Sequence, residues 1–213
     1  MDQAEFECAV GDLVARDTDL AALVELHGTP TVWVRPPGFP ALVLLVLEQQ
    51  VSLASGAAAY RRVGARVGPM TPEGVLSTTA AQLREDGVSW QKDRYLRALA
   101  DAVVSGALDL ASLEAADDDT VRRHLTALPG IGQWTADSYL LACLGRPDVW
   151  PVGDRALQVA VGETLHLGST PGPVDLERFG ERWRPLRASA ARLLWHGYLR
   201  RRGRTETATD VLR

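Results

Sequence analysis

Two glycines beside a helix start are the residues near the middle of the chain best placed to do chemistry. Gly130 and Gly132 lie in the stretch Leu128–Ala136 (LPGIGQWTA), where Pro129 ends one helical pattern and a second pattern follows. The backbone N–H groups at a helix start have no partner within the helix and carry the positive end of its dipole. This turn could therefore bind one phosphate group. The alternative is a plain connection between two helices, and the two glycines alone do not separate these interpretations.

Asp154 is a second candidate, and the chain offers little else for metal or redox chemistry. Asp154 follows Gly153 and precedes Arg-Ala-Leu, which is a favourable position for a helix N-cap. The two cysteines, Cys8 and Cys143, are too few for the four thiolates of an iron–sulfur cluster. The histidines are scattered and do not have the spacing of a transition-metal site.

The composition of the 213 residues predicts one compact domain or two small lobes that share a chain. A hydrophobic content of 46% with 23% charged residues is typical of a globular protein. No apolar run is long enough for a membrane span, and the acidic N-terminus has no signal-peptide core, so we expect a cytoplasmic protein. The net charge of −4 hides an arginine-rich C-terminal part, so charge argues neither for nor against a nucleic-acid partner.

Helices must position these residues, because apolar side chains recur at helical spacing along most of the chain. Residues 1–26 predict a helix or a helix pair, and residues 31–34 a short strand or an extended segment. A long buried helix is predicted over about residues 40–63, although Gln49 and Gln50 interrupt its apolar run. Further helices are predicted from residue 71 and over residues 92–107, 119–125, 134–144, 159–165, 174–183 and 186–199. The fold class is therefore all-α.

Four sequence strings together resemble one family. LPGIGQWTA is similar to the helix-hairpin-helix of DNA base-excision glycosylases, and Asp148–Leu157 (DVWPVGDRAL) to their loop that ends in an invariant aspartate. Asp154 lies 22 residues after Gly132, as in that family. The other two strings are Leu47–Ser52 (LEQQVS) and Glu181–Arg187 (ERWRPLR) with Trp195 downstream. Over roughly residues 38–200 the chain thus resembles the HhH-GPD superfamily, of the 3-methyladenine DNA glycosylase II type.

The resemblance implies a fold of two helical lobes that flank a DNA-binding cleft, without an iron–sulfur cluster. One lobe would comprise about residues 1–37 and 150–213, and the other about residues 38–149. The helix-hairpin-helix would cover about residues 119–145. The implied partner is double-stranded DNA that contains alkylated bases, bound by a monomer, in association with the nucleoid if the protein is bacterial.

The implied activity is that of a monofunctional glycosylase that excises alkylated purines after base flipping. The carboxylate of Asp154 would stabilise the oxocarbenium-like transition state and orient the attacking water. Relatives that also nick the strand carry a lysine just before the Thr-Ala pair of the hairpin, where this chain has Trp134. Lys92 is the only lysine and nothing in the sequence places it near Asp154, so no lyase activity is expected.

The resemblance also assigns roles to residues around the aspartate and the hairpin. The residues of the base pocket would be Trp134, Trp195, Ser138 and Trp90. The residues that contact DNA would be Gln49, Gln50, Ser52, Gly130, Gly132, Gln133 and Thr135, with Gln50 inserted into the duplex. No cofactor is required, although main-chain carbonyls of Thr126, Leu128 and Ile131 would hold a sodium or potassium ion. Without the resemblance, both glutamines could be helix caps or buried hydrogen-bond partners, and Trp90 and Trp195 ordinary core or surface aromatics.

A rival hypothesis is a non-catalytic helix-hairpin-helix module that senses or bends damaged DNA. Asp154 argues against it, because a pure binder of anionic DNA has no need of a carboxylate there. A glycosylase with lyase activity toward 8-oxoguanine or pyrimidines is disfavoured by Trp134 and by the missing cysteines.

Overall fold

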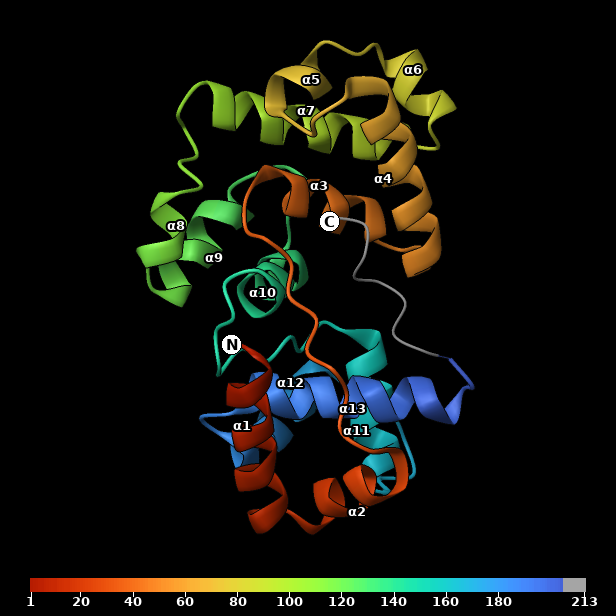
Figure 1. Ribbon diagram of the computed structural model, residues 1–213, viewed down its shortest axis with the longest axis vertical. Helices are drawn as coiled ribbons and strands as arrows, with labels where there is room; N and C mark the ends of the chain where they lie inside the picture. The colour runs from red at the N-terminus through yellow and green to blue at the C-terminus, as the bar shows by residue number, and fades with distance from the viewer. Residues whose placement is uncertain (205–213) are drawn as a thin grey trace. The chain divides into compact units, whose positions relative to one another are not determined.

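The computed structural model describes residues 1–204, and this part of the chain is built from helices without β-strands. The predicted all-α fold is thus confirmed (Figure 1). The chain folds as two compact units. Unit 1 consists of Met1–Val34 and the described chain from Gly145 onward, and unit 2 of Arg35–Leu144. The lobe boundaries predicted near residues 37 and 149 stay a prediction. Residues 205–213, which the prediction assigned to the first lobe, lie outside the described part.

Unit 1 is organised around its last helix. Helix α13 packs on α1, α2 and α11, and its first eight residues are all buried because small and apolar side chains dominate them. Fully buried Phe6, Leu20 and Trp183 complete the core beside it. The elements of this unit are α1 (Gln3–Arg16), α2 (Thr18–His27), α11 (Arg155–Thr164), α12 (Pro173–Gly180), the 3-10 helix η1 (Glu181–Trp183) and α13 (Arg187–Arg201).

Unit 2 is organised around a short apolar helix, α3 (Phe39–Glu48), which is hydrophobic on every side. Such a helix must be buried, and α3 packs on α4, α7 and α10. The other helices begin mostly at Ser, Thr or Asp N-caps, whose side chains accept backbone N–H groups. They are α4 (Leu53–Val67), α5 (Pro72–Leu76), α6 (Ala80–Glu85), α7 (Trp90–Val104), α8 (Ser112–Ala115), α9 (Asp118–Thr126) and α10 (Gln133–Ala142).

The prediction of one long helix over residues 40–63 is wrong. The chain leaves the helix after Glu48 and starts α4 at Leu53. Gln50 has a left-handed backbone with φ of 57°, and the Ser52 hydroxyl caps the new helix by accepting the N–H of Ser55 at 3.2 Å. Polar residues such as Gln49 and Gln50 also occur inside helices, so their presence in the run does not by itself predict a break. The predicted helix 92–107 likewise begins earlier, at Trp90, where Ser89 provides the N-cap.

A buried ion pair anchors the C-terminal end of α3. Arg35 donates two hydrogen bonds to the carboxylate of Glu48, both 2.8 Å long, and both side chains are almost fully buried. Burial raises the pKa of Glu48, and the guanidinium of Arg35 opposes that rise. The same burial raises the pKa of Cys143 to about 12, so this thiol stays protonated. The pair therefore fixes the residue that directly precedes Gln49.

The described residues form neither the short strand considered for residues 31–34 nor a helix that could cross a membrane. Residues 29–37 have no regular secondary structure, so the strand considered for residues 31–34 does not form. Within residues 1–204, none of the helices combines the length and the apolar character that crossing a bilayer requires.

Candidate nucleic-acid interface and carboxylate site

The hairpin between α9 and α10 depends on one glycine for its shape. Gly130 has φ of 82°, which favours glycine, and a Cβ at this position would run into the ring of Tyr95. Ile131 is buried below the turn. By contrast, a Cβ on Gly132 would meet no atom within 4 Å. Gly130 is thus required by the fold, whereas the space above Gly132 is open for a partner to approach the backbone.

The start of α10 presents backbone N–H groups without a capping side chain from the described residues. Gly132 occupies the N-cap position and cannot supply one. The side-chain amide of the exposed residue Gln133 donates to Asp137 at 3.2 Å, and Thr135 is buried, with 2% exposure. Their backbone N–H groups at the helix start are the ones suited to an anion.

The carbonyls named for a monovalent cation lie around the same turn. Thr126 is the last residue of α9, and Leu128 and Ile131 belong to the turn. The Leu128 oxygen already accepts the Ile131 N–H at 3.2 Å, which uses one of its two lone pairs. Neutral carbonyl oxygens are hard donors and fit a sodium or potassium ion rather than a transition metal. In the described chain, no group of three or more His, Cys, Asp or Glu residues is arranged to hold a metal.

Gln49 connects the turn after α3 to the hairpin. Its side-chain amide donates to the Gly130 carbonyl at 2.8 Å and to the Thr135 hydroxyl at 3.0 Å. Gln49 is thus a hydrogen-bond partner within the protein, which is one of the roles that the sequence left open beside a contact with DNA. Gln50, the next residue, is exposed in its left-handed conformation, and Ser52 caps α4.

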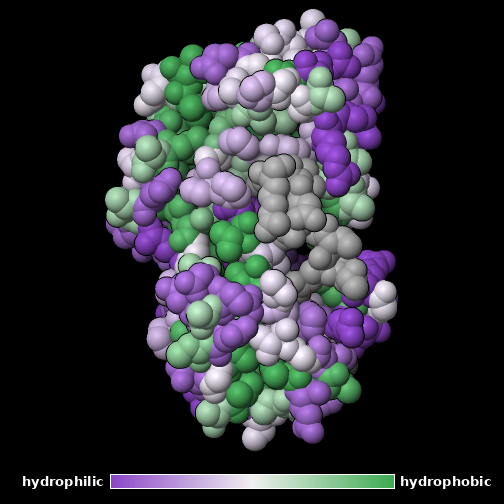
Figure 2. Space-filling model, in the orientation of Figure 1, coloured by the Kyte–Doolittle hydropathy of each residue, from purple (hydrophilic) through white to green (hydrophobic). Residues whose placement is uncertain are grey.

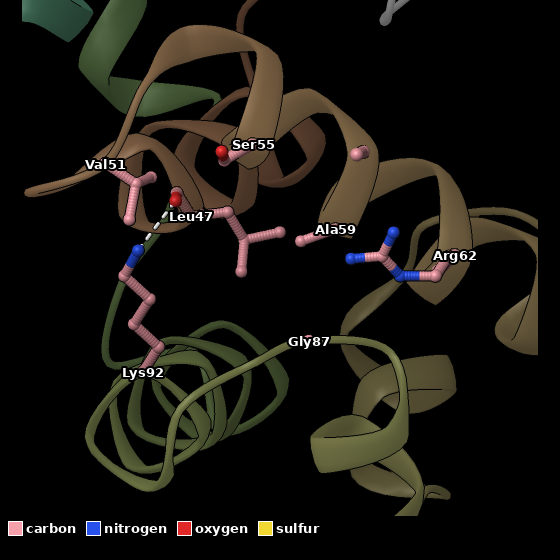
Figure 3. Close-up of a pocket in the computed structure, with 8 residues that line it drawn as sticks. Leu47, Val51, Ser55, Ala59, Arg62, Gly87 and Lys92 are labelled. Carbon is pink, nitrogen blue, oxygen red and sulfur yellow. Dashed lines mark hydrogen bonds between the residues drawn. The ribbon is translucent and has the colours of Figure 1, made fainter.

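Lys92 also supports this turn. Its ammonium donates to the Leu47 carbonyl at 2.7 Å, and burial lowers the pKa of the amine (Figure 3). Both residues line a pocket of about 320 Å³ on the inner side of α4, together with Val51, Ser55, Ala58, Ala59, Arg62 and Gly87. Trp90, in the first turn of α7, is 56% exposed, and the guanidinium carbon of Arg84 lies 5.9 Å from its ring centroid.

The other two pocket candidates of unit 2 share one side of α10. Trp134 and Ser138 are four residues apart, which places them on the same helix face, and both are half-buried. The buried residues Thr135, Ala136 and Tyr139 occupy the rest of the helix surface. The structure of unit 2 thus brings Gln49, Gly130 and Thr135 into direct contact and places Trp134 beside them in the chain.

In unit 1, Asp154 caps α11 and is held by an indole. Its Oδ1 accepts the Leu157 N–H at 2.7 Å and the Trp195 Nε1–H at 3.0 Å. The carboxylate is half-exposed, and both donors fix the direction in which it points. Trp195 lies on α13, so two different helices position this side chain. The N-cap role inferred from the sequence is present, and it leaves the carboxylate accessible.

The loop that carries Asp154 is fixed at its start as well. Arg187 donates from Nε to Asp148 Oδ1 at 2.9 Å and from a terminal nitrogen to the Asp148 carbonyl at 2.8 Å. The Trp150 indole donates to the Leu176 carbonyl at 2.9 Å. At the other end, the Asp154 N–H donates to the Pro151 carbonyl at 2.9 Å. A loop held at these points presents its aspartate in one orientation.

Trp33, which lies beside Trp195, and Arg192, which contacts Trp33, have no predicted role in the sequence. The Trp33 ring centroid lies 6.5 Å from that of Trp195, and Arg192 contacts Trp33 from α13. Trp33 lies in a segment without helical or alternating periodicity, so no local pattern could assign it a place. The support that Lys92 gives to Leu47 was also not foreseen, since it depends on tertiary packing.

Known proteins resemble this chain in sequence and in fold. Residues 43–185 match the family described as HhH-GPD superfamily base excision DNA repair protein. A solved DNA-3-methyladenine glycosidase from Bacillus halodurans is 36% identical, with a TM-score of 0.76, and the alignment covers 89% of this chain and 88% of that one. A Schizosaccharomyces pombe 3-methyladenine DNA glycosylase in complex with abasic DNA is 25% identical, with a TM-score of 0.82, covering 88% and 94%.

The chain therefore belongs to the HhH-GPD superfamily of base excision DNA repair proteins. A putative DNA-3-methyladenine glycosylase of Bacillus subtilis is also similar to this chain, with 26% identity over 187 residues, which is 84% of this chain. The match spans 65% of that relative's own length.

Proposed function

We propose that this protein is a DNA glycosylase that hydrolyses the N-glycosidic bond of alkylated purines and leaves an abasic site. The observation that carries the proposal is the carboxylate of Asp154, held by the Leu157 N–H and the Trp195 indole in a half-exposed position. The names of the relatives, 3-methyladenine glycosylases and glycosidases, support the substrate class. The abasic DNA in the Schizosaccharomyces pombe structure supports the product.

The hairpin would hold the damaged strand. The open space above Gly132 and the N–H groups at the start of α10, which no side chain of residues 1–204 caps, suit one phosphate. A sodium or potassium ion on the carbonyls of Thr126, Leu128 and Ile131 would add positive charge there. Gln50, exposed on its left-handed turn, would enter the duplex, and Gln49 would keep that turn fixed to the hairpin.

The chemistry would take place at the sugar of the everted nucleotide. The bond between C1′ and the base nitrogen breaks, and its electron pair leaves with the base. The Asp154 carboxylate stabilises the positive charge that develops on the sugar and accepts a proton from the water that attacks C1′. Indoles suit alkylated purines, which are electron-poor and in part cationic. Trp134 and Trp195 would form the stacking surfaces, and Ser138 and Trp90 would complete the base-binding residues.

The absence of strand nicking is part of the proposal. A lyase needs an amine that forms a Schiff base with C1′. Trp134 stands in the hairpin position where such an amine would be expected, and the chain has one lysine, whose ammonium donates to the Leu47 carbonyl. Water is therefore the proposed nucleophile, and we expect the protein to act as a monomer on double-stranded DNA.

The test compares wild type with Asp154→Asn on a duplex alkylated at random by a methylating agent. Asparagine is also a good N-cap, so the variant keeps the fold while it loses the charge. Free methylpurines and alkali-independent nicks are quantified. We expect release by wild type, a loss of about a hundredfold or more in Asp154→Asn, and intact abasic sites. Asp2→Asn, which changes the N-cap of α1 in the same unit, is the matched control and should retain the wild-type rate.

Three outcomes would contradict the proposal in different ways. Equal release by wild type and Asp154→Asn would remove the aspartate from the mechanism. Nicking without alkali would mean that a lyase is present despite Trp134. Tight binding of alkylated DNA with no release by either protein would favour the damage-sensing module instead.

A further inference from the structure

An aromatic and cationic cluster stands behind Asp154 in unit 1. Trp195 joins the carboxylate to this cluster, since its indole N–H is one of the two donors to Oδ1. The ring of Trp33 lies against that of Trp195, with centroids 6.5 Å apart and planes inclined by 37°. Both indoles are half-buried. The path from Trp33 to the carboxylate therefore runs through a single side chain.

Arg192 fixes Trp33 in two ways. Its guanidinium donates to the Trp33 carbonyl at 2.9 Å, and its central carbon lies 4.6 Å from the Trp33 ring centroid. The side chain of Arg192 is buried, with 3% exposure, and a guanidinium removed from water makes a strong contact with an indole face. Arg192 and Trp195 are three residues apart on α13, so the helix presents both to the same region.

The contacts of Arg192 hold a residue that lies outside regular secondary structure. Trp33 belongs to the segment between α2 and α3, which has no regular secondary structure and so provides no backbone ladder to hold a large side chain. Replacing an aromatic ring by a small side chain here would remove the surface on which the Trp195 ring rests. An indole that is free to tilt would lose the direction of its N–H, and with it the hydrogen bond from Trp195 to Asp154.

We propose that Trp33, clamped by Arg192, is a positioning residue for the reaction: it fixes the Trp195 indole so that its N–H orients the Asp154 carboxylate. The inference rests on the proposed role of Asp154. It adds that the orientation of the carboxylate depends on a residue outside the strings shared with the family. Because misplacement of a reacting group by about 1 Å can cost a hundredfold in rate, the effect belongs to the chemical step rather than to DNA binding.

The first test measures single-turnover base release and DNA affinity separately. We expect Trp33→Ala to slow release about tenfold or more while the Kd for alkylated duplex stays within about twofold of wild type. Trp33→Phe keeps a ring for Trp195 to pack on and should recover most of the rate. Tyr198→Ala is the matched control. Tyr198 is a half-buried aromatic on α13, the helix that carries Arg192 and Trp195, and the guanidinium carbon of Arg202 lies 3.8 Å from its ring centroid. It should release base at the wild-type rate.

A double mutant separates positioning from general packing. Trp195→Phe removes the N–H and keeps a ring. If Trp33 acts through that N–H, Trp33→Ala combined with Trp195→Phe should be no slower than Trp195→Phe alone. Multiplying effects in the double mutant, or a lower melting temperature with an unchanged release rate in Trp33→Ala, would overturn the proposal.

A measurement without substrate keeps the inference distinct from the proposed function. The Trp195 indole N–H resonance is assigned by its loss in Trp195→Phe, and its proton exchange is then compared in wild type, Trp33→Ala and Tyr198→Ala. We expect faster exchange and a shifted resonance in Trp33→Ala only. If wild type releases no base but this change is seen, the proposed function fails and the positioning stands. An unchanged resonance overturns the positioning itself.

Discussion

At the scale of single residues, Asp154 shows how one side chain can serve the fold and the chemistry together. Its Oδ1 accepts the N–H of the helix that it caps and the N–H of an indole from another helix. An N-cap contributes about 1 kcal/mol to stability, and this contribution does not require that the carboxylate be buried. A half-exposed aspartate held by two donors is oriented without losing access to a partner. Asp154→Asn therefore removes the charge and keeps the N-cap, so the two effects can be measured separately.

Lys92 offers a direct test of the interior of unit 2, because it is the only lysine. Burial lowers the pKa of its amine below the ordinary value of 10.5. Between the folded pKa and 10.5 the unfolded chain binds more protons. The stability of wild type relative to Lys92→Met should therefore rise as the pH rises across this window and fall as the pH falls through the folded pKa.

The pKa itself can be read by NMR after isotopic methylation of the amines. We expect the Lys92 resonance to titrate below 10.5 in the native protein and near 10.5 in urea. Native and unfolded titrations that coincide would show that the contact with the Leu47 carbonyl does not exclude water from the amine.

At the scale of elements, the hairpin contains two glycines with different tasks. Gly130→Ala places a methyl group against the Tyr95 ring at a backbone φ of 82°. We expect it to lower the free energy of unfolding by roughly 1–3 kcal/mol. Gly132→Ala meets no neighbour in the free protein and should cost less than about 1 kcal/mol, but its methyl group occupies the approach of a phosphate.

Urea unfolding and fluorescence anisotropy with a labelled duplex distinguish the two variants. The prediction for the hairpin is that Gly132→Ala keeps its stability and binds DNA more weakly. Wild-type affinity in this variant would mean that the backbone above Gly132 does not meet DNA.

The ion pair at the end of α3 gives a prediction about the element that carries Gln49. Glu48→Ala leaves the guanidinium of Arg35 buried without its carboxylate, which should cost about 3–5 kcal/mol of unfolding free energy. The double variant Arg35→Met with Glu48→Leu removes both charges and should recover most of this loss. Urea denaturation of the single and double variants decides the matter. A double variant as unstable as Glu48→Ala would show that the pair contributes more than charge compensation.

The elements also show what the sequence predicts and what it leaves open. Helical periodicity and caps predict the all-α fold and most helices of both units, because these signals are local. The polar residues Gln49 and Gln50 interrupt the apolar run after Glu48, but the sequence does not show that the helix ends there, because only tertiary contacts reveal that Gln49 donates to Gly130. The arrangement of Trp33 behind Trp195 has no local signal at all. The roles given to Gln50, Trp90 and the carbonyls of the hairpin stay predictions, because they need DNA or an ion to be tested.

At the scale of the whole molecule, the arginine-rich C-terminal part is not a free basic surface. Arg182 pairs with Asp17 and Asp19, and Arg187 pairs with Asp148 and Glu177. Glu163 accepts from both Arg201 and Arg202. The face drawn in Figure 2 is a mosaic of hydrophilic and hydrophobic residues. Because these arginines are paired, we expect neutral donors such as the N–H groups of α10 to make a large share of the contacts with DNA.

This charge distribution predicts a weak salt dependence of DNA binding. Each phosphate neutralised by a lysine or arginine contributes about −0.9 to the slope of log K against log salt concentration, whereas neutral N–H donors release no counterions of their own. We expect a slope on the order of −3, measured by anisotropy between about 50 and 200 mM salt, rather than the value of about −5 to −9 that six to ten cationic contacts would give. A slope as steep as that would mean that the arginine pairs open on DNA.

The slope should also be insensitive to mild acid. Arg202 lowers the pKa of Glu163 below its ordinary value of 4.5, so the stability that this carboxylate contributes is present above 4.5 and is lost as the pH falls through the lowered pKa. At about pH 6 and about pH 8 the carboxylate is therefore ionised and still compensates both arginines. The two slopes should agree. A steeper slope at the lower pH would mean that a positive charge gained between the two pH values takes part in binding, either on a histidine or on an arginine whose carboxylate partner is released.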